Sequence, residues 1–120
     1  MLLPAMIAAR EKVDFTKNLA VMLKSGIAVN EAMSSLADQA KSRALAAIIR
    51  RITNEVETGT SLGQAFAKRE KIFGAVFVNL IKVGEASGTL DESLAFLADW
   101  LERDYDLRQD IKSATIYPKF

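Results

Sequence analysis

Apolar residues recur three and four positions apart along most of the chain, a spacing typical of amphipathic helices. No stretch alternates apolar and polar residues for long enough to indicate a β-strand. Gly26, Gly59 and Gly88 fall where three of the helical stretches should end, and glycine readily adopts the left-handed conformation that closes a helix. The pattern predicts an all-α fold, a compact antiparallel bundle of about six helices.

Polar residues mark where several of these helices should begin. Asp14 and Ser42 precede apolar stripes and are candidate N-caps. Ser61-Leu62-Gly63-Gln64 and Thr89-Leu90-Asp91-Glu92 both match the capping box, in which the first and last side chains satisfy each other's backbone donors. The sequence therefore predicts helices that start at four defined positions.

The last predicted helix is the longest. It extends to about Thr115, because Pro118 opposes further continuation. Lys68-Arg69-Glu70-Lys71 is predicted to be a polar turn between two earlier helices, with Ile72 and Phe73 anchoring it to the core.

Composition narrows the chemistry that such a bundle could perform. The 120 residues fit one domain, and they include no His and no Cys. Serine–histidine and cysteine–histidine catalysis, imidazole or thiolate metal sites and disulfides are therefore excluded. The net charge of +1 provides no field to attract nucleic acid, so no nucleic-acid partner is expected. Any enzyme with this composition would have to work with carboxylates, Lys, Tyr or a cofactor.

One motif resembles a catalytic one. Gly59-Thr60-Ser61-Leu62-Gly63 matches GxSxG, the nucleophile elbow of many hydrolases. That elbow joins a strand to a helix and needs a base for the serine, whereas here both flanks are helical and histidine is absent. We interpret Ser61 as a helix cap.

Gly84-Glu85-Ala86-Ser87-Gly88 places a glycine inside a predicted helix, which costs about 1 kcal/mol relative to alanine. Two explanations are open. Another helix approaches closely at Gly84, or Gly84, Glu85 and Gly88 form a helix corner that binds a partner.

The last predicted helix is rich in acidic residues. Asp99, Glu102 and Asp106 share a face and could offer oxygens to a hard cation such as Ca²⁺. They lack the loop of a dedicated site, so a solvated face is favoured and no cofactor is expected, with an adventitious divalent cation as the remaining option.

Three segments, taken in order, carry a resemblance. They are Phe15–Ile27, Gly59–Phe66 and Val83–Leu90, and Tyr117-Pro118 follows them. Together they resemble the first cytoplasmic domain of the type II secretion F family, the inner-membrane platform proteins of type II secretion and type IV pilus machines. The resemblance extends from about Val13 to Phe120.

The resemblance implies a six-helix cytoplasmic domain over residues 13–117. Residues 1–12 match nothing and are interpreted as an N-terminal extension or a cloning remnant. In this family the Tyr-Pro pair lies just before a membrane helix, so Tyr117 and Pro118 would be membrane-proximal. Residues 118–120 would then begin a transmembrane segment that is missing here, and the parent protein would be integral to the membrane.

The function implied by the resemblance is not enzymatic: it is that of a scaffold at the cytoplasmic face of the bacterial inner membrane. It would couple the assembly ATPase to pilin or pseudopilin subunits and contact other inner-membrane components. The alternatives are a free-standing soluble helical adaptor or regulator, and a small helical enzyme, which a pocket with convergent carboxylates would favour.

Several apolar residues fit none of the predicted stripes. They are Ile7, Val21, Ile72, Val78 and Trp100. A small bundle with apolar residues to spare indicates a homodimer.

Overall fold

The computed structural model describes residues 7–116, with side chains up to Ile111, and every regular element in that range is a helix. The helices are α1 (Ala9–Lys24), α2 (Val29–Gln39), α3 (Arg43–Glu57), α4 (Leu62–Ala67), α5 (Glu70–Phe73), α6 (Ala75–Ser87) and α7 (Leu90–Ile116). The predicted all-α fold is confirmed. The described residues contain seven helices rather than about six.

The additional helix is α5, which lies where the sequence predicted a polar turn. It is a single turn, closed by a hydrogen bond of 2.7 Å from the N–H of Gly74 to the carbonyl of Glu70. Phe73 is buried and Ile72 is partly buried against the core, so both anchor this connection as expected.

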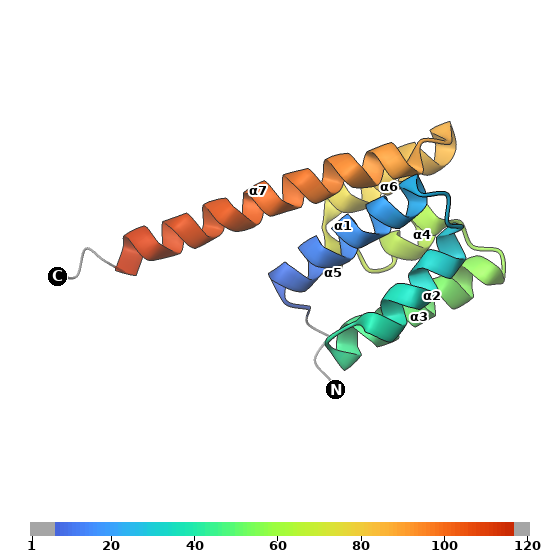
Figure 1. Ribbon diagram of the computed structural model, residues 1–120, viewed down its shortest axis with the longest axis horizontal. Coiled ribbons are helices and arrows are strands. Elements are labelled where there is room, and N and C mark those ends of the chain that lie inside the picture. Colours follow the sequence, from blue (N-terminus) through green and yellow to red (C-terminus); the bar gives the residue numbers. More distant parts are fainter. Residues whose placement is uncertain (1–6, 117–120) are drawn as a thin grey trace.

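Two groups of helices form the body of the molecule (Figure 1). The helix α7 packs against α1 and α6, α4 packs beneath α6, and α2 and α3 pair on the far side of α1. The first half of α7 contributes Leu94, Leu97 and Leu101 to the core. Its second half projects beyond the body, because a helix of 27 residues is about 40 Å long.

Four phenylalanines from four helices meet in the core. Phe66 of α4 has its ring centroid 5.0 Å from those of Phe73 and Phe77, and Phe15 of α1 lies 6.4 Å from Phe73. All four side chains are buried. This cluster joins α1, α4, α5 and α6.

Glycines end the helices as predicted. Gly26 and Gly59 have φ of +93° and +116°, and each is followed by a residue whose N–H bonds back across the last turn. These bonds run from Ile27 to the carbonyl of Met22 at 3.1 Å and from Thr60 to that of Glu55 at 2.9 Å. The geometry is that of the Schellman motif, so backbone carbonyls that would otherwise lack a partner are satisfied.

Two of the predicted N-caps are also confirmed. The hydroxyl of Ser42 accepts a hydrogen bond from the N–H of Leu45 at 3.1 Å, and that of Ser61 accepts one from Gln64 at 3.2 Å. Ser61 is therefore a helix cap, and the GxSxG match is not a nucleophile elbow.

The predicted cap at Asp14 is wrong, because α1 begins five residues earlier, at Ala9. Asp14 lies inside the helix and pairs with Arg10 at 3.0 Å. Lys12 donates from Nζ to the carbonyl of Ile72 at 3.0 Å, and Glu11 accepts from the N–H of Ser42 at 3.2 Å. The helix thus crosses the boundary expected between residues 12 and 13, and its first turns contact the bundle. Residues 1–6 lie outside the described residues.

The apolar residues that matched no stripe have different positions. Val78 belongs to the core, and Ile7 and Ile72 pack partly buried against it. Only Val21 and Trp100 are exposed, at 63% and 41%. Of the five residues on which the prediction of a homodimer was based, only these two are exposed and so available for self-association.

We expect the bidentate ion pair between Glu55 and Arg69 to make stability depend on pH. The two bonds measure 2.8 and 2.7 Å, and hydrogen bonding to Arg69 lowers the pKa of Glu55 below its ordinary 4.5. The pKa of Glu55 is lower in the folded chain than in the unfolded chain. The stabilisation from the ion pair is therefore complete above the pKa of the unfolded chain, and it is lost as the pH falls through the pKa of the folded chain. Glu55→Gln should cost about 1.5 kcal/mol at neutral pH, since the Glu55 side chain is 24% exposed.

Urea unfolding of the wild type and Glu55→Gln at pH 7 and at about pH 3 measures this effect. The difference in free energy of unfolding should shrink sharply at the acidic pH. An equal difference at both values would show that the ion pair does not contribute through the charge of Glu55.

Candidate functional site

The predicted partner-binding residues Gly84, Glu85 and Gly88 lie at one end of the bundle. Here the ends of α1, α3 and α6 meet the starts of α2, α4 and α7, at the right-hand end of the molecule in Figure 1. A groove of about 630 Å³ opens between these corners. Its apolar lining includes Leu23, Ile27, Val29, Val56, Leu62 and Leu90, and its polar lining includes Asn30, Glu85 and Asp91.

The helices α6 and α7 pack closely at Gly84. A Cβ atom added there would lie 2.6 Å from Oγ of Ser93 and 3.0 Å from Cα of Leu90. Real Cβ atoms do not approach other atoms so closely, so no side chain fits without movement. The first of the two explanations for this glycine, close approach of another helix, is confirmed.

Glu85 caps a neighbouring helix with its carboxylate. Its two oxygens accept hydrogen bonds from the N–H groups of Leu62 at 2.7 Å and Gly63 at 2.9 Å, the first two residues of α4. A carboxylate is favourable there because the N-terminus of a helix carries partial positive charge. Gly63 permits this approach, since a Cβ there would lie 3.3 Å from Oε1 of Glu85.

The structure shows one of the two hydrogen bonds of the capping box predicted at α4. Ser61 accepts from the N–H of Gln64 as expected, and the preceding N–H groups, of Leu62 and Gly63, bind Glu85, which lies 23 and 22 residues further along the chain. The only sign of this long-range contact in the sequence is that its residues belong to segments that carry the family resemblance. Leu62 and Gly63 lie in Gly59–Phe66, and Glu85 lies in Val83–Leu90.

Gly88 ends α6 in the left-handed conformation, with φ of +72°. The N–H of Thr89 then bonds to the carbonyl of Gly84 at 2.9 Å, and α7 begins at the next residue. Gly88 therefore sets the sharp corner between α6 and α7. All three predicted residues have structural roles at the groove, and their contact with a partner stays a prediction.

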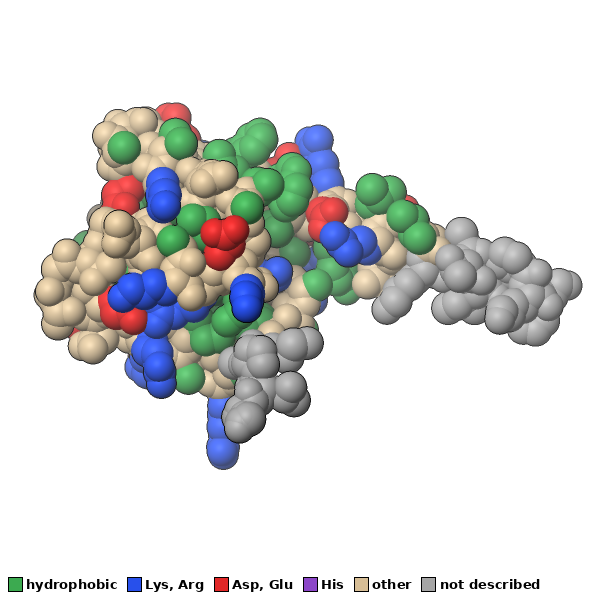
Figure 2. Space-filling model, turned by 180° about the vertical axis from the view of Figure 1, so that it is seen from behind, with side chains coloured by type: hydrophobic (Ala, Val, Ile, Leu, Met, Phe, Trp, Pro, Cys, Tyr) green, Lys and Arg blue, Asp and Glu red, His purple; other side chains and the backbone are tan. Residues whose placement is uncertain are grey.

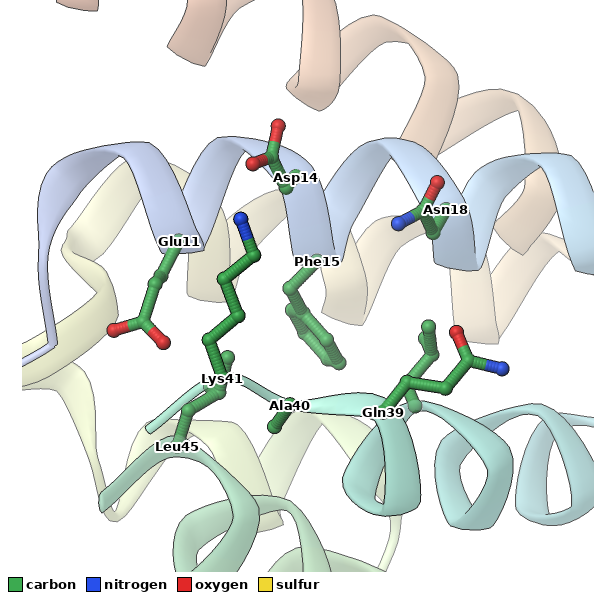
Figure 3. A pocket seen from close by; sticks show the side chains of 9 residues that line it. Glu11, Asp14, Phe15, Asn18, Gln39, Ala40, Lys41 and Leu45 are labelled. Atoms are coloured by element: carbon green, nitrogen blue, oxygen red, sulfur yellow. The ribbon is translucent and has the colours of Figure 1, made fainter. Parts of the chain in front are cut away.

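A second, smaller pocket has two carboxylates in its lining. It measures about 180 Å³ and lies between α1 and the connection from α2 to α3, with Glu11, Asp14, Phe15 and Lys41 around it (Figure 3). Ligand pockets are typically about 300–1,000 Å³. Glu11 bonds the backbone of Ser42, Asp14 pairs with Arg10, and their carboxylates point in different directions in Figure 3. The pocket does not have the convergent carboxylates that would favour an enzyme.

Comparison with known proteins places the chain in a family. The family model described as type II secretion system (T2SS), protein F, matches residues 15–120. The chain belongs to the type II secretion system protein F family. The resemblance noted in the sequence is therefore confirmed.

Relatives in this family come from both kinds of machine. A type IV pilus assembly protein PilC from Thermus thermophilus is 38% identical over 104 residues, covering 87% of this chain and 25% of the relative. A type 4 fimbrial assembly protein PilC from Pseudomonas putida is 36% identical, covering 91% and 28%. A type II secretion system protein F from Xanthomonas campestris is 32% identical, covering 88% and 26%. The chain spans about a quarter of the length of these relatives.

The family resemblance was first noted in three segments, and in the structure these converge on the groove. The first segment ends at Ile27, the second contains Leu62, and the third contains Gly84, Glu85 and Leu90. The sequence indicated Glu85 as a site residue but not the apolar residues around it. These residues come from the ends of six helices, and only the fold brings them together. Each of the three segments includes a predicted helix end, and this shared feature could have indicated the groove.

Proteins of the type II secretion F family are inner-membrane components of the secretion and pilus machinery. Among the described residues, none of the helices combines the length and the apolar character needed to span a bilayer. Tyr117 and Pro118, predicted to be membrane-proximal, lie outside the described residues.

The acidic residues of α7 point to different neighbours. Glu102 faces α1, where it pairs with Lys17 at 3.1 Å and Arg10 at 3.6 Å, whereas Asp99 pairs with Arg103 at 3.0 Å. In the part of the chain that the structure describes, no three acidic side chains are grouped so that they could hold a metal ion. The divalent cation suggested for Asp99, Glu102 and Asp106 stays an untested prediction.

Proposed function

We propose that this domain is a cytoplasmic scaffold of the inner-membrane platform, which couples the assembly ATPase to pilin or pseudopilin assembly. The machine is a type IV pilus or a type II secretion system, since relatives of both kinds match the chain over most of its length. The groove at the end of the bundle is the surface through which the domain contacts the ATPase.

The observation that carries this proposal is the convergence of the three family segments on one groove. Its floor is apolar and partly buried, with Leu23, Ile27, Val29 and Val56 all packed against the core. Partly exposed apolar surface in a concave site is what a partner side chain can cover favourably. The free-standing adaptor that the sequence also allowed has no observation of its own in its favour.

The construction of this end of the bundle suits the transmission of force. The carboxylate of Glu85 joins α6 to the start of α4, and the contact at Gly84 holds α6 against α7. A movement imposed on one helix would therefore be passed to its neighbours, because these contacts leave little room for independent motion. This role needs no catalytic group, in agreement with a family of assembly proteins.

The test places a large side chain in the groove without disturbing the core. Ala28 is exposed, lines the groove and has an extended backbone that accepts any side chain. Ala28→Trp, introduced in the full-length protein, should reduce co-purification of the assembly ATPase at least tenfold and abolish pilus assembly or secretion. Ala47→Trp, on the exposed face of α3 away from the groove, is the matched control.

Both variants should have the melting temperature of the wild type, because neither residue is buried. If Ala28→Trp left ATPase binding and assembly unchanged, the groove would not be the contact surface. If Ala47→Trp impaired binding equally, the effect would not be specific to the groove.

Self-association of the domain stays a prediction. Sedimentation at several protein concentrations tests it, and a single monomeric species throughout would exclude a homodimer of this domain.

A further inference from the structure

Three large apolar side chains remain exposed along one face of α7. Phe96, Trp100 and Leu107 are 61%, 41% and 58% exposed. At 3.6 residues per turn, the three positions point within about 40° of one another. The buried residues Leu97 and Leu101 point about a third of a turn away, so the exposed stripe is separate from the face that packs on α1 and α6.

The stripe is long enough to receive another helix. From Phe96 to Leu107 it extends for about 16 Å, or three helical turns. In Figure 2 hydrophobic side chains continue from the body of the molecule onto the projecting part of α7. Phe and Trp are enriched at the centres of protein interfaces, where burial of an aromatic ring contributes most to affinity.

Acidic side chains follow one side of this stripe. Glu92, Asp99, Asp106 and Asp110 are exposed there, and Arg103 is the one basic residue among them. Four carboxylates and one guanidinium leave three negative charges in excess. On the other side of the stripe, Asp104 and Arg108 form an ion pair at 2.9 Å, so their charges cancel.

We propose that this face of α7 is a docking surface for an amphipathic helix of another protein, one whose apolar stripe is flanked by Lys and Arg. The apolar residues would pack along Phe96, Trp100 and Leu107, and the basic flank would lie against the carboxylates. This surface lies further along α7 than the groove does. The proposal does not depend on the function proposed for the groove.

The distribution of charge favours this occupant over two others. A second copy of the chain packed antiparallel would place acidic flank against acidic flank, and a parallel copy would gain no opposite charge. An anionic membrane surface would repel the excess negative charge. Within the described residues, α1 and α6 already pack on another side of α7.

Trp100 provides a direct readout, because it is the only tryptophan in the chain and it lies in the stripe. The probes are two synthetic helical peptides of about 18 residues with the same leucine stripe, one flanked by lysines and the other by glutamates. The lysine peptide should shift Trp100 fluorescence to shorter wavelength in a saturable manner and bind several-fold more weakly at about 0.3 M than at 0.05 M salt. The glutamate peptide should cause no shift.

Variants locate the binding on the stripe. Leu107→Glu should weaken binding of the lysine peptide at least tenfold, while its melting temperature stays that of the wild type because the residue is exposed. Val21→Glu removes an equally exposed apolar residue from α1, outside the stripe, and should bind as the wild type does.

Four outcomes would overturn the proposal. They are equal binding of both peptides, equal loss of binding in the two variants, a dimer that buries Trp100 without any peptide, and a Leu107-dependent fluorescence shift with anionic lipid vesicles. The last two would identify a second copy or a membrane as the occupant.

Discussion

Phe66→Ala is expected to lower the free energy of unfolding by about 3–5 kcal/mol. The ring of Phe66 is fully buried and lies 5.0 Å from the rings of both Phe73 and Phe77, edge-on to the first. Truncation leaves a cavity where α4, α5 and α6 meet and removes two aromatic contacts. The surrounding helices relax only partly into such a cavity, because each is also packed against other parts of the core.

Urea unfolding followed by circular dichroism measures this loss, and an unchanged slope against urea would show that the folded state stays compact. Phe66→Leu is the matched control, since it keeps most of the volume and should cost about 1–2 kcal/mol. A loss below about 1 kcal/mol for Phe66→Ala would mean that the four-ring cluster does not stabilise the bundle.

Gly84→Val is expected to destabilise the bundle by about 3 kcal/mol or more, and Gly84→Ala by about 1–3 kcal/mol. Even the first added carbon would lie 2.6 Å from Oγ of Ser93 and 3.0 Å from the backbone of Leu90. The backbone atom cannot rotate away, so α6 and α7 must separate. The gain in helix propensity from glycine to alanine, about 1 kcal/mol, offsets only part of this cost.

Gly63→Ala is the matched control for Gly84→Ala, because Gly63 is also buried in a helix. Its added Cβ would lie 2.6 Å from Cγ of Lys82, but the nearest backbone atom, Cα of Lys82, would be 3.3 Å away, compared with 3.0 Å at Gly84. Thermal unfolding should therefore show a smaller loss for Gly63→Ala. Equal losses would contradict the view that close packing of α6 on α7 is what requires glycine at position 84.

Much of the fold could be predicted from the sequence, because helix ends depend on residues close together in the chain. Gly26, Gly59 and Gly88 end their helices, and Ser42 and Ser61 begin theirs, since each acts on backbone groups within about five residues. The three family segments could be recognised for the same reason, as short ordered strings of residues.

The errors arose where distant parts of the chain decide local structure. Asp14 is a good cap by residue type, yet α1 continues through it to Ala9. Its first turns gain partners from 31 and 60 residues away, as Glu11 bonds Ser42 and Lys12 bonds Ile72. Likewise α5 forms as a single turn because Phe73 is drawn into the ring cluster.

The sequence by itself therefore determined the class of fold, most helix limits, the absence of histidine and cysteine chemistry, and the family. Only the tertiary structure decided what the candidate residues do. Glu85 caps α4 rather than standing as a free charge. Its partners, the N–H groups of Leu62 and Gly63, are 23 and 22 residues away in sequence, and only the fold brings them to the carboxylate. The exposed stripe of α7 also required the structure, since which apolar face of a helix is buried depends on how its neighbours pack.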